Sequence, residues 1–509
     1  MPAELLEAAA AHAGPRATAE GVRWLVDNAS AYDAMLAAIG GARRSVWMSQ
    51  LAFDADCLAY DAPGAVPDTV GRRLVDAVIA ASTARAVDVR VLLNASLLLD
   101  TAAPLRAFLR RAGAAGVQVR GVGRFPQLLH AKIILVDGTE AFLVGSPFAN
   151  GYWDDASHRP VDARRPPREL GGRPLHDLSC AITGPAVVTL AAYFAELWND
   201  VSTGAGEYRR LSAAAHAASP AGAIRVARTA PRRVLRARPE GIAEILPEIE
   251  AGLDAARSLV YIEHQYLSAR PVIAALSAAL ERAPALEVIA VLNQNPDVTA
   301  YRGWQNARLR EAGLLDHPRV GLFALWSATP RATRRPRWDV NQVFVHSKVL
   351  AVDDVWATVG SANLDGVSLH SYGDDFAGFA GRRVFRHVRN FDVNAILDDR
   401  ERALSGAVRD LRMRLWHEHL GLGPGRLAEP TDGGWLACWR AQAARNVAAL
   451  AGGDDAPSYA GFVLPYSTRA TPREQFAAAG IDPDGVRFHF NPGWLEVHCS
   501  PNWVRNMFI

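Results

Sequence analysis

Lysine is almost absent from this chain. Of its 55 lysine and arginine residues only two are lysines, Lys132 and Lys348, and arginine supplies every other strongly basic side chain. A compact ammonium differs from a planar guanidinium in reach and in hydration, so the two exceptions indicate positions that arginine cannot fill. We therefore expect these two lysines to share one chemical task.

Cysteine is also scarce. The four cysteines are Cys57, Cys180, Cys438 and Cys499, which lie far apart and show no metal-binding spacing. This pattern argues against a zinc site and favours buried free thiols over disulfides. We predict that the protein uses no metal and no cofactor.

A large excess of charge and a long apolar run are both missing. The formal net charge is +2, whereas proteins that grip many backbone phosphates usually carry a basic excess. No stretch reaches the roughly 20 apolar residues that span a bilayer, and the first residues lack the pattern of a secretory signal. Nucleic acid is therefore not favoured as a partner. We expect a soluble monomer that is cytoplasmic or peripheral on membranes, with leaderless export as an effector still open.

The chain contains a long internal repeat. Each copy has an apolar strand, a helical stretch, a second strand and a strand-turn-strand unit. The strand segments are 42–53, 87–94 and 128–150 in the first copy and 256–267, 286–293 and 343–365 in the second. Strands that alternate with helices predict parallel strands with crossover helices. We predict an α/β fold in which two α/β/α halves form a fused dimer about a pseudo-two-fold axis.

The repeat also predicts domain limits. We expect an N-terminal half over 1–215, a C-terminal half over 216–421, and an extension over 422–509 that has no counterpart in the first half. Segment 212–223 is rich in small residues and reads as the linker. The tryptophans of the extension favour core packing over an interfacial role at a lipid surface; they are Trp435, Trp439, Trp494 and Trp503.

A matching motif, His-x-Lys-x4-Asp followed by Gly-Ser, occurs once in each copy. Its residues are His130, Lys132, Asp137 and Ser146 in the first copy and His346, Lys348, Asp353 and Ser361 in the second. Residues i and i+2 of a strand share a face, so each His and Lys project together. With 14 histidines in 509 residues, a lysine falls two residues after one by chance about once in 36 cases. The two motif aspartates fall at strand ends, which favours a structural role over a catalytic one.

Two histidines and two lysines suit phosphodiester cleavage. One imidazole can attack phosphorus as a nucleophile, while the other protonates the leaving oxygen and then activates water or an alcohol. Two ammonium groups neutralise the charge that builds on the phosphoryl oxygens. A lone motif could equally be a strand-end histidine beside a solvated lysine, but two motifs in register with a repeat argue against that reading.

These motifs resemble the HKD motifs of the phospholipase D superfamily, over about residues 22–421. Four more segments resemble parts of its phospholipid enzymes; they are HDLSCAITGPAV (176–187), RTAPRR (228–233), VYIEHQYL (260–267) and LRMRLWHEHLG (411–421). The resemblance implies two phospholipase D-like halves, a phosphohistidine intermediate, no metal, and a phospholipid substrate at a membrane surface.

The resemblance also implies roles for individual residues. His130 would be the nucleophile and His346 the general acid and base. A carboxylate later in each half would orient the histidine of its own half. Asp177 fits this place for His130 and Asp392 for His346, with Asp374–Asp375 as competitors.

The resemblance further implies phosphate-binding side chains. Ser146, Ser361 and Asn363 fit the family pattern. The first copy departs from it, because Phe148 stands at the position of Asn363 and Asn150 follows two residues later. Either Asn150 substitutes through a local bulge, or the first half lacks this phosphate donor.

We therefore predict a phospholipase D-like phosphodiesterase that hydrolyses or transfers the head group of a glycerophospholipid. Three alternatives stand behind it. The missing transmembrane segments weaken a cardiolipin synthase-like phosphatidyltransferase, and the balanced charge weakens a nuclease or another phosphodiesterase. A non-enzymatic lipid-binding module fits least, because both motifs are intact.

Overall fold

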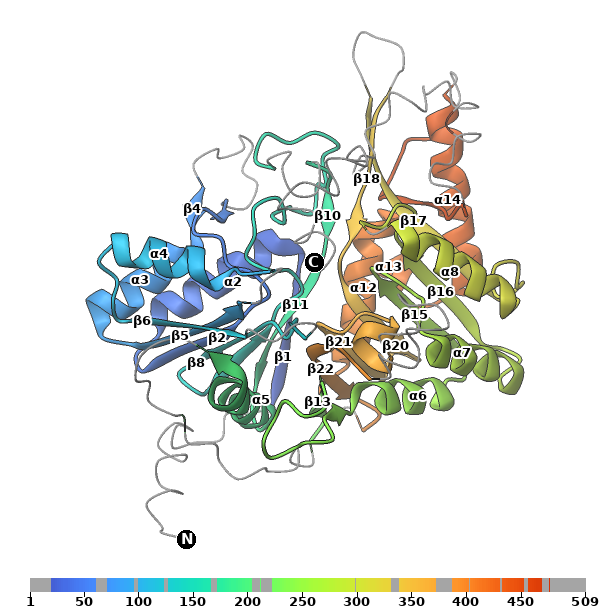
Figure 1. Cartoon of the computed structure of the whole chain (residues 1–509). Coiled ribbons are helices and arrows are strands. Elements are labelled where there is room, and N and C mark those ends of the chain that lie inside the picture. The colour runs from blue at the N-terminus through green and yellow to red at the C-terminus, as the bar shows by residue number, and fades with distance from the viewer. Residues whose placement is uncertain are drawn as a thin grey trace.

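The computed structural model describes most of the chain as two α/β units that lie side by side (Figure 1). The described residues are 20–60, 71–95, 99–122, 127–165, 172–203, 211, 222–297, 299–330, 338–371, 387–401, 403–430, 433–452, 456–468 and 476. Each unit is built on one mixed sheet with helices on both faces. Asp374–Asp375, segment 212–221, Cys499, Trp494 and Trp503 lie outside the described residues.

The first unit is an eight-stranded sheet in the order β1-β11-β9-β8-β2-β5-β6-β12. Its strands are β1 (Gly21–Val26), β2 (Ser45–Ser49), β5 (Asp88–Asn94), β6 (Val117–Val122), β8 (Ile133–Val136), β9 (Glu140–Leu143), β11 (Leu178–Thr183) and β12 (Ser202–Thr203), and β3 (Leu58–Ala59) pairs with β4 (Arg72–Arg73) beside them. Three helices cover one face, namely α2 (Asp27–Gly41), α3 (Leu74–Arg85) and α4 (Ala102–Arg111). Helix α5 (Ala186–Glu196), which continues into a π-helical turn at Leu197–Val201, packs on the other face (Figure 1).

The second unit is an eleven-stranded sheet whose main path is β14-β13-β22-β21-β20-β15-β16-β17-β18. These strands are β13 (Ile224–Ala230), β14 (Ile242–Ala243), β15 (Leu259–His264), β16 (Glu287–Leu292), β17 (Val320–Pro330), β18 (Trp338–Gln342), β20 (Lys348–Val352), β21 (Trp356–Gly360) and β22 (Asn390–Asp398). Its helices are α6 (Ile245–Ala255), α7 (Arg270–Arg282), α8 (Thr299–Glu311), α9 (Gly366–Leu369), α12 (Ala407–Leu420), α13 (Pro424–Leu427) and α14 (Gly434–Ala451). Helices α6 and α7 pack on one face of the sheet, and α12 and α14 on the other.

The two sheets repeat one topology. The order β1-β11-β9-β8-β2-β5-β6 of the first returns as β13-β22-β21-β20-β15-β16-β17 in the second. A single hydrophobic core contains side chains of both sheets together with α5, α12 and α14. The predicted α/β class and the fused two-half architecture are therefore confirmed, while the limits predicted for the domains stay predictions.

Two short strands cross from one half to the other. Strand β7 (Leu128–Leu129) pairs in parallel with β22 of the second half. Strand β10 (Leu175–His176) of the first half pairs in parallel with β19 (Phe344–Val345) of the second. In both cases the segment that precedes a motif histidine lies against the segment that carries a candidate carboxylate of the other half.

The described part of the C-terminal extension completes the second half. Strand β23 (Val463–Pro465) adds to the sheet beside β17. Trp439 is fully buried, and both Trp435 and Trp439 meet the ring of Trp416 edge to face, with centroids 5.1 and 5.4 Å away. The core-packing interpretation is therefore confirmed for these two tryptophans.

Two smaller expectations also have an outcome. Cys57, Cys180 and Cys438 are buried and form no disulfide with one another in the described part of the chain, as expected from their spacing. Within the part of the chain that the structure describes, no helix combines the length and the apolar character that crossing a membrane requires.

Candidate active site

The two motifs meet in one buried site. His130 and Lys132 lie between β7 and β8, while His346 and Lys348 lie where β19 leads into β20. Each of the four residues is at most 2 % exposed. Ser146 Oγ of the first motif lies 3.4 Å from His346 Nδ1 of the second, so the two motifs are neighbours although they belong to different halves. The structure thus brings together the four side chains that the repeat singled out.

Each histidine is oriented by a carboxylate of the other half. His130 Nδ1 donates to Asp392 Oδ1 at 2.6 Å, and His346 Nδ1 donates to Asp177 Oδ2 at 2.8 Å. The pairing predicted from the resemblance, with each carboxylate serving its own half, is therefore wrong. The cause is the strand crossing: the His130 backbone N–H donates to the carbonyl of Phe391 at 3.0 Å.

The same crossing acts at the second histidine. The His346 backbone N–H donates to the carbonyl of His176 at 2.8 Å. Asp177 directly follows His176, and Asp392 directly follows Phe391. Each carboxylate therefore lies beside the histidine ring of the opposite half. Both halves therefore contribute to the environment of each histidine.

The Gly-Ser pairs of the motifs hold the carboxylates. The Ser146 hydroxyl donates to Asp177, and the Ser361 hydroxyl donates to Asp392 Oδ1 at 2.8 Å. These contacts hold the two carboxylates, while the substrate-binding role expected of both serines stays a prediction. The adjacent Gly145 leaves room for the Asp177 carboxylate, because a Cβ there would lie 2.1 Å from Asp177 Oδ1.

Burial sets the charge of the site. Burial and the charge of Lys132 lower the pKa of His130 to about 4, although Asp392 opposes the shift. Burial and Lys348 likewise lower the pKa of His346 to about 3. The free site therefore holds two neutral imidazoles at neutral pH. Burial raises the pKa of each carboxyl, but the facing histidine ring outweighs it and holds that pKa below its usual value.

The lysines are also perturbed. Burial and the neighbouring ammonium lower the pKa of Lys132 to about 7, and burial lowers the pKa of Lys348 to about 8. Two cations forced together in a buried site repel each other, and an anion between them relieves that repulsion. The arrangement is therefore suited to a phosphate.

The hydrogen bonds select the tautomer that a nucleophile needs. With Nδ1–H committed to a carboxylate, the lone pair of each ring resides on Nε2. Nε2 of His130 lies 3.2 Å from Lys132 Nζ, and Nε2 of His346 has no hydrogen-bond partner among the described residues. The reactive nitrogen of His130 thus lies where an ammonium group can also hold a phosphoryl oxygen.

The two halves differ at the expected asparagines. Asn363 is 5 % exposed, and its Oδ1 has no hydrogen-bond partner within the described parts of the chain. Phe148, at the equivalent place, packs its ring against Tyr32 and Phe53 in the core. For Asn150 the structure shows a backbone N–H that donates to an Asp54 carboxylate oxygen. A phosphate-binding role for either asparagine stays a prediction.

The motif aspartates lie at the opposite ends of their strands from the histidines. The Asp137 carboxylate accepts backbone N–H groups from 43–45 at the start of β2. The Asp353 carboxylate accepts those of 257–259 at the start of β15. Both residues have positive φ, 54° and 51°, which short polar side chains tolerate. These contacts support the structural role expected of them.

Some neighbours of the site were missed from the sequence. Lys348 Nζ donates to Gln265 Oε1 at 3.2 Å, the Tyr152 ring meets the His346 ring edge to face at 5.4 Å, and Asn28 Nδ2 donates to Ser146 Oγ at 2.9 Å. Gln265 lies at the end of a strand that pairs with the motif strand, so strand register could have found it. Tyr152 and Asn28 come from segments that carry no repeat signal.

Comparison with known families agrees with this geometry. The family described as "Cardiolipin synthase, PLD-like domain" matches residues 35–151 and 249–405, together more than half of the chain. The first match contains His130 and the second contains His346. The chain therefore belongs to the phospholipase D superfamily, a group of phosphodiesterases and phosphatidyltransferases, and the resemblance stated from the motifs is confirmed.

Individual relatives are more distant. Phospholipase D C of Dictyostelium discoideum is 33% identical over 102 residues, which cover 17% of this chain and 5% of that protein. Phospholipase D A of the same organism is 36% identical over 83 residues, 16% of this chain and 6% of that protein. The chain thus matches only about a twentieth of the length of these curated relatives. The crystal structure of phosphatidylserine synthase from Haemophilus influenzae has a TM-score of 0.50 at 12% identity and covers 80% of this chain and 90% of its own, which shows a shared fold.

Proposed function

We propose that this protein is a phospholipase D-type enzyme that cleaves or exchanges the head group of a glycerophospholipid through a phosphohistidine on His130. The observation that carries the proposal is the convergence of two histidines and two lysines, one pair from each half, in one buried site. In each ring Nδ1 donates to a carboxylate, which leaves Nε2 as the reactive atom.

In the first step the Nε2 lone pair of His130 attacks phosphorus. The P–O bond to the head group breaks as the P–N bond forms, and the departing oxygen takes a proton from His346. Asp392 stabilises the positive charge that His130 gains in this step. The phosphatidyl group is then held on His130.

In the second step a water or alcohol oxygen attacks phosphorus while His346 takes its proton. The P–N bond breaks, and His130 returns to the neutral form. His346 is protonated again and ready for the next cycle. Water gives phosphatidic acid, and an alcohol gives a new phosphatidyl ester.

The bound phosphate prepares His346 for its role as an acid. In the free site burial and Lys348 hold the pKa of His346 low. The phosphodiester anion brings negative charge among these groups, and a nearby negative charge raises the pKa of an imidazole. Lys132 and Lys348 meanwhile stabilise the charge that builds on the phosphoryl oxygens.

A lipid substrate is favoured for two reasons. The net charge of +2 is low for a protein that holds many nucleic-acid phosphates, and the curated relatives are named phospholipases D. The similar fold of a phosphatidylserine synthase makes transfer to an alcohol the natural partner reaction to test.

A substrate panel analysed by mass spectrometry tests this proposal. It contains several glycerophospholipids in mixed micelles, single-stranded DNA and a small soluble diester, each with and without ethanol. We expect phosphatidic acid from at least one phospholipid, phosphatidylethanol when ethanol is present, and neither from His130→Ala. Cleavage of DNA with no lipid turnover would contradict the choice of substrate.

Replacing Asp392 and replacing Asp177 should affect different steps of the reaction, because each carboxylate holds the histidine of the opposite half. Asp392→Asn should prevent the intermediate from forming, because it removes the charge that stabilises His130 as it attacks, and a comparable change in a catalytic triad costs about 10⁴ in turnover. Asp177→Asn should still form the intermediate from a nitrophenyl diester, whose leaving group needs little protonation, but should hydrolyse it slowly. Burst kinetics measure both. The opposite assignment of the two phenotypes would show that each carboxylate serves its own half.

The lysine pKa values predict an alkaline limb in the pH profile. The cationic form is the active one, so kcat/KM for a soluble diester should fall as pH rises past about 7 to 8, where Lys132 and Lys348 lose their protons. Since kcat/KM reports the free enzyme, titration over pH 5 to 9 is the measurement. In Lys132→Arg the pH profile of the residual activity should no longer show the fall near pH 7, which belongs to Lys132. A flat profile up to pH 9 would contradict the assignment.

A further inference from the structure

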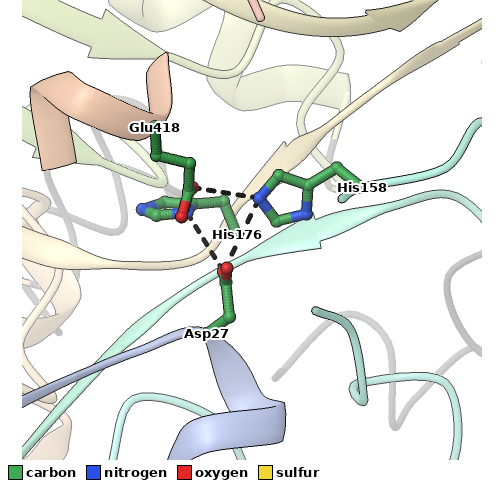
Figure 2. Close-up of side chains that lie close together, drawn as sticks. All are labelled: Asp27, His158, His176 and Glu418. Atoms are coloured by element: carbon green, nitrogen blue, oxygen red, sulfur yellow. Dashed lines mark hydrogen bonds and ion pairs between the residues drawn. The ribbon is translucent and has the colours of Figure 1, made fainter. Parts of the chain in front are cut away.

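A second group of ionisable side chains is buried beside the candidate active site. It comprises Asp27, His158, His176 and Glu418, whose side chains are at most 9% exposed (Figure 2). They come from the start of α2, the loop after β9, strand β10 and helix α12. The group therefore joins the closing helix of the second half to three segments of the first.

The four side chains point toward one common centre. Asp27 Oδ1 lies 3.1 Å from His176 Nδ1 and 3.6 Å from His158 Nε2. Glu418 Oε1 lies 2.7 Å from His176 Nδ1 and 3.1 Å from His158 Nε2. All four atoms lie within 4.8 Å of one another. A tetrahedral ion with bonds of about 2.0 to 2.1 Å has ligand-to-ligand distances of about 3.3 Å, so these spacings fit a small cation.

Hydrogen bonds account for only part of this packing. Of the four close N–O approaches, the one between His158 and Glu418 has hydrogen-bond geometry. Both carboxylate oxygens of Asp27 and the Nδ1 of His176 are buried and have no hydrogen-bond partner among the described residues. Buried carboxylates without a partner are costly. A cation at the centre would satisfy Asp27 Oδ1 and His176 Nδ1.

The outer nitrogens of both rings face further carboxylates. His158 Nδ1 lies 2.9 Å from Asp154 Oδ2, and Asp154 is held in turn by Arg165. His176 Nε2 lies 2.8 Å from Glu263 Oε1, a close approach without hydrogen-bond geometry. The hydrogen bond from His158 to Asp154 fixes that ring and its tautomer, and a carboxylate in this place is the usual support of a metal-binding imidazole.

The fold itself does not demand this group. Strand register makes the second-half equivalent of Asp27 a threonine, Thr229, and that of His176 a phenylalanine, Phe391. The second half therefore builds the same sheet without these ligands. Asp27 and His176 have no counterpart in the second half, which points to a task other than forming the sheet.

We propose that Asp27, His158, His176 and Glu418 bind one Zn²⁺ ion in a closed tetrahedral site, which departs from the expectation of no metal because that expectation considered cysteine spacing and not these scattered residues. Four protein ligands leave no open position, which is the arrangement of a structural zinc site rather than a catalytic one. The ion would tie α12 to α2 and β10, and its ligand His176 directly precedes Asp177. This site is separate from the reacting imidazoles and does not depend on the proposed function.

Metal analysis of the whole chain tests the proposal. The protein is expressed in zinc-supplemented medium, purified without chelators, and measured by inductively coupled plasma mass spectrometry. We expect about one zinc per chain. The X-ray absorption spectrum at the zinc edge should show a shell of nitrogen and oxygen at about 2.0 to 2.1 Å with imidazole scattering and no sulfur.

A matched pair of isosteric variants locates the ion. Glu418→Gln should lower the zinc content at least tenfold, whereas Asp392→Asn, which changes a buried carboxylate outside the group, should keep it. No zinc in the wild type, together with a melting temperature that added ZnCl₂ leaves unchanged, would overturn the proposal. Sulfur in the zinc shell, or equal zinc in Glu418→Gln and the wild type, would also overturn it. If Glu418→Gln does not fold, the absorption spectrum of the wild type decides.

Discussion

Replacing either lysine of the motifs by arginine lowers turnover by about 10² to 10³, the usual cost of losing one preorganised donor. Lys132 and Lys348 are at most 1 % exposed, so neither pocket opens to accept a larger planar group. Lys132 Nζ also lies 3.2 Å from the reactive nitrogen of His130, and a guanidinium there would displace the phosphate. The measurement is steady-state turnover of a soluble diester.

A second substitution separates activity from stability. Burial lowers the pKa of Lys132, which means that folding disfavours its charge. Lys132→Met should therefore melt no lower than the wild type while showing no turnover. Near-normal rates in Lys132→Arg or Lys348→Arg, with unchanged melting temperatures, would show that the restriction of lysine to these two places is accidental.

The two histidines should fail in different ways. His130→Ala should form no intermediate and show no turnover with any diester, because the nucleophile is gone. His346→Ala should still form the intermediate from a nitrophenyl diester, whose leaving group departs without a proton. The intermediate should then accumulate in this variant, because the base that activates water is missing.

Stopped-flow release of nitrophenolate measures this difference. We expect a burst of about one equivalent followed by a very slow phase in His346→Ala, and no burst in His130→Ala. The wild type provides the reference for the size and rate of the burst. A burst in His130→Ala that is absent from His346→Ala would reverse the two roles.

Much of this architecture was predictable from the sequence. The repeat is visible because each half buries equivalent strands. Buried strands require apolar side chains, so hydrophobic runs occur at matching positions in the two halves. The His-x-Lys pairs stand out because a strand has a two-residue period, so both side chains reach one site. The restriction of lysine to Lys132 and Lys348 indicated that this site differs from every other basic position.

The crossed carboxylates could not be predicted in the same way. The exchange depends on two very short strands, β7 and β10, each of which pairs with the opposite half. A strand of only two residues is too short to show a periodic pattern in the sequence. The order along the chain also suggests the wrong pairing, that of His130 with Asp177. The group around His176 was missed for a related reason, since its members are scattered over almost 400 positions of the chain.

Trapping the intermediate on the wild-type enzyme tests the central claim most directly. The enzyme is mixed with a nitrophenyl phosphodiester, quenched without acid, and analysed by intact-protein and peptide mass spectrometry. We predict one adduct per chain, on His130. An adduct on His346 would exchange the two roles. Turnover with inversion at phosphorus and no adduct on either histidine would contradict the covalent mechanism itself.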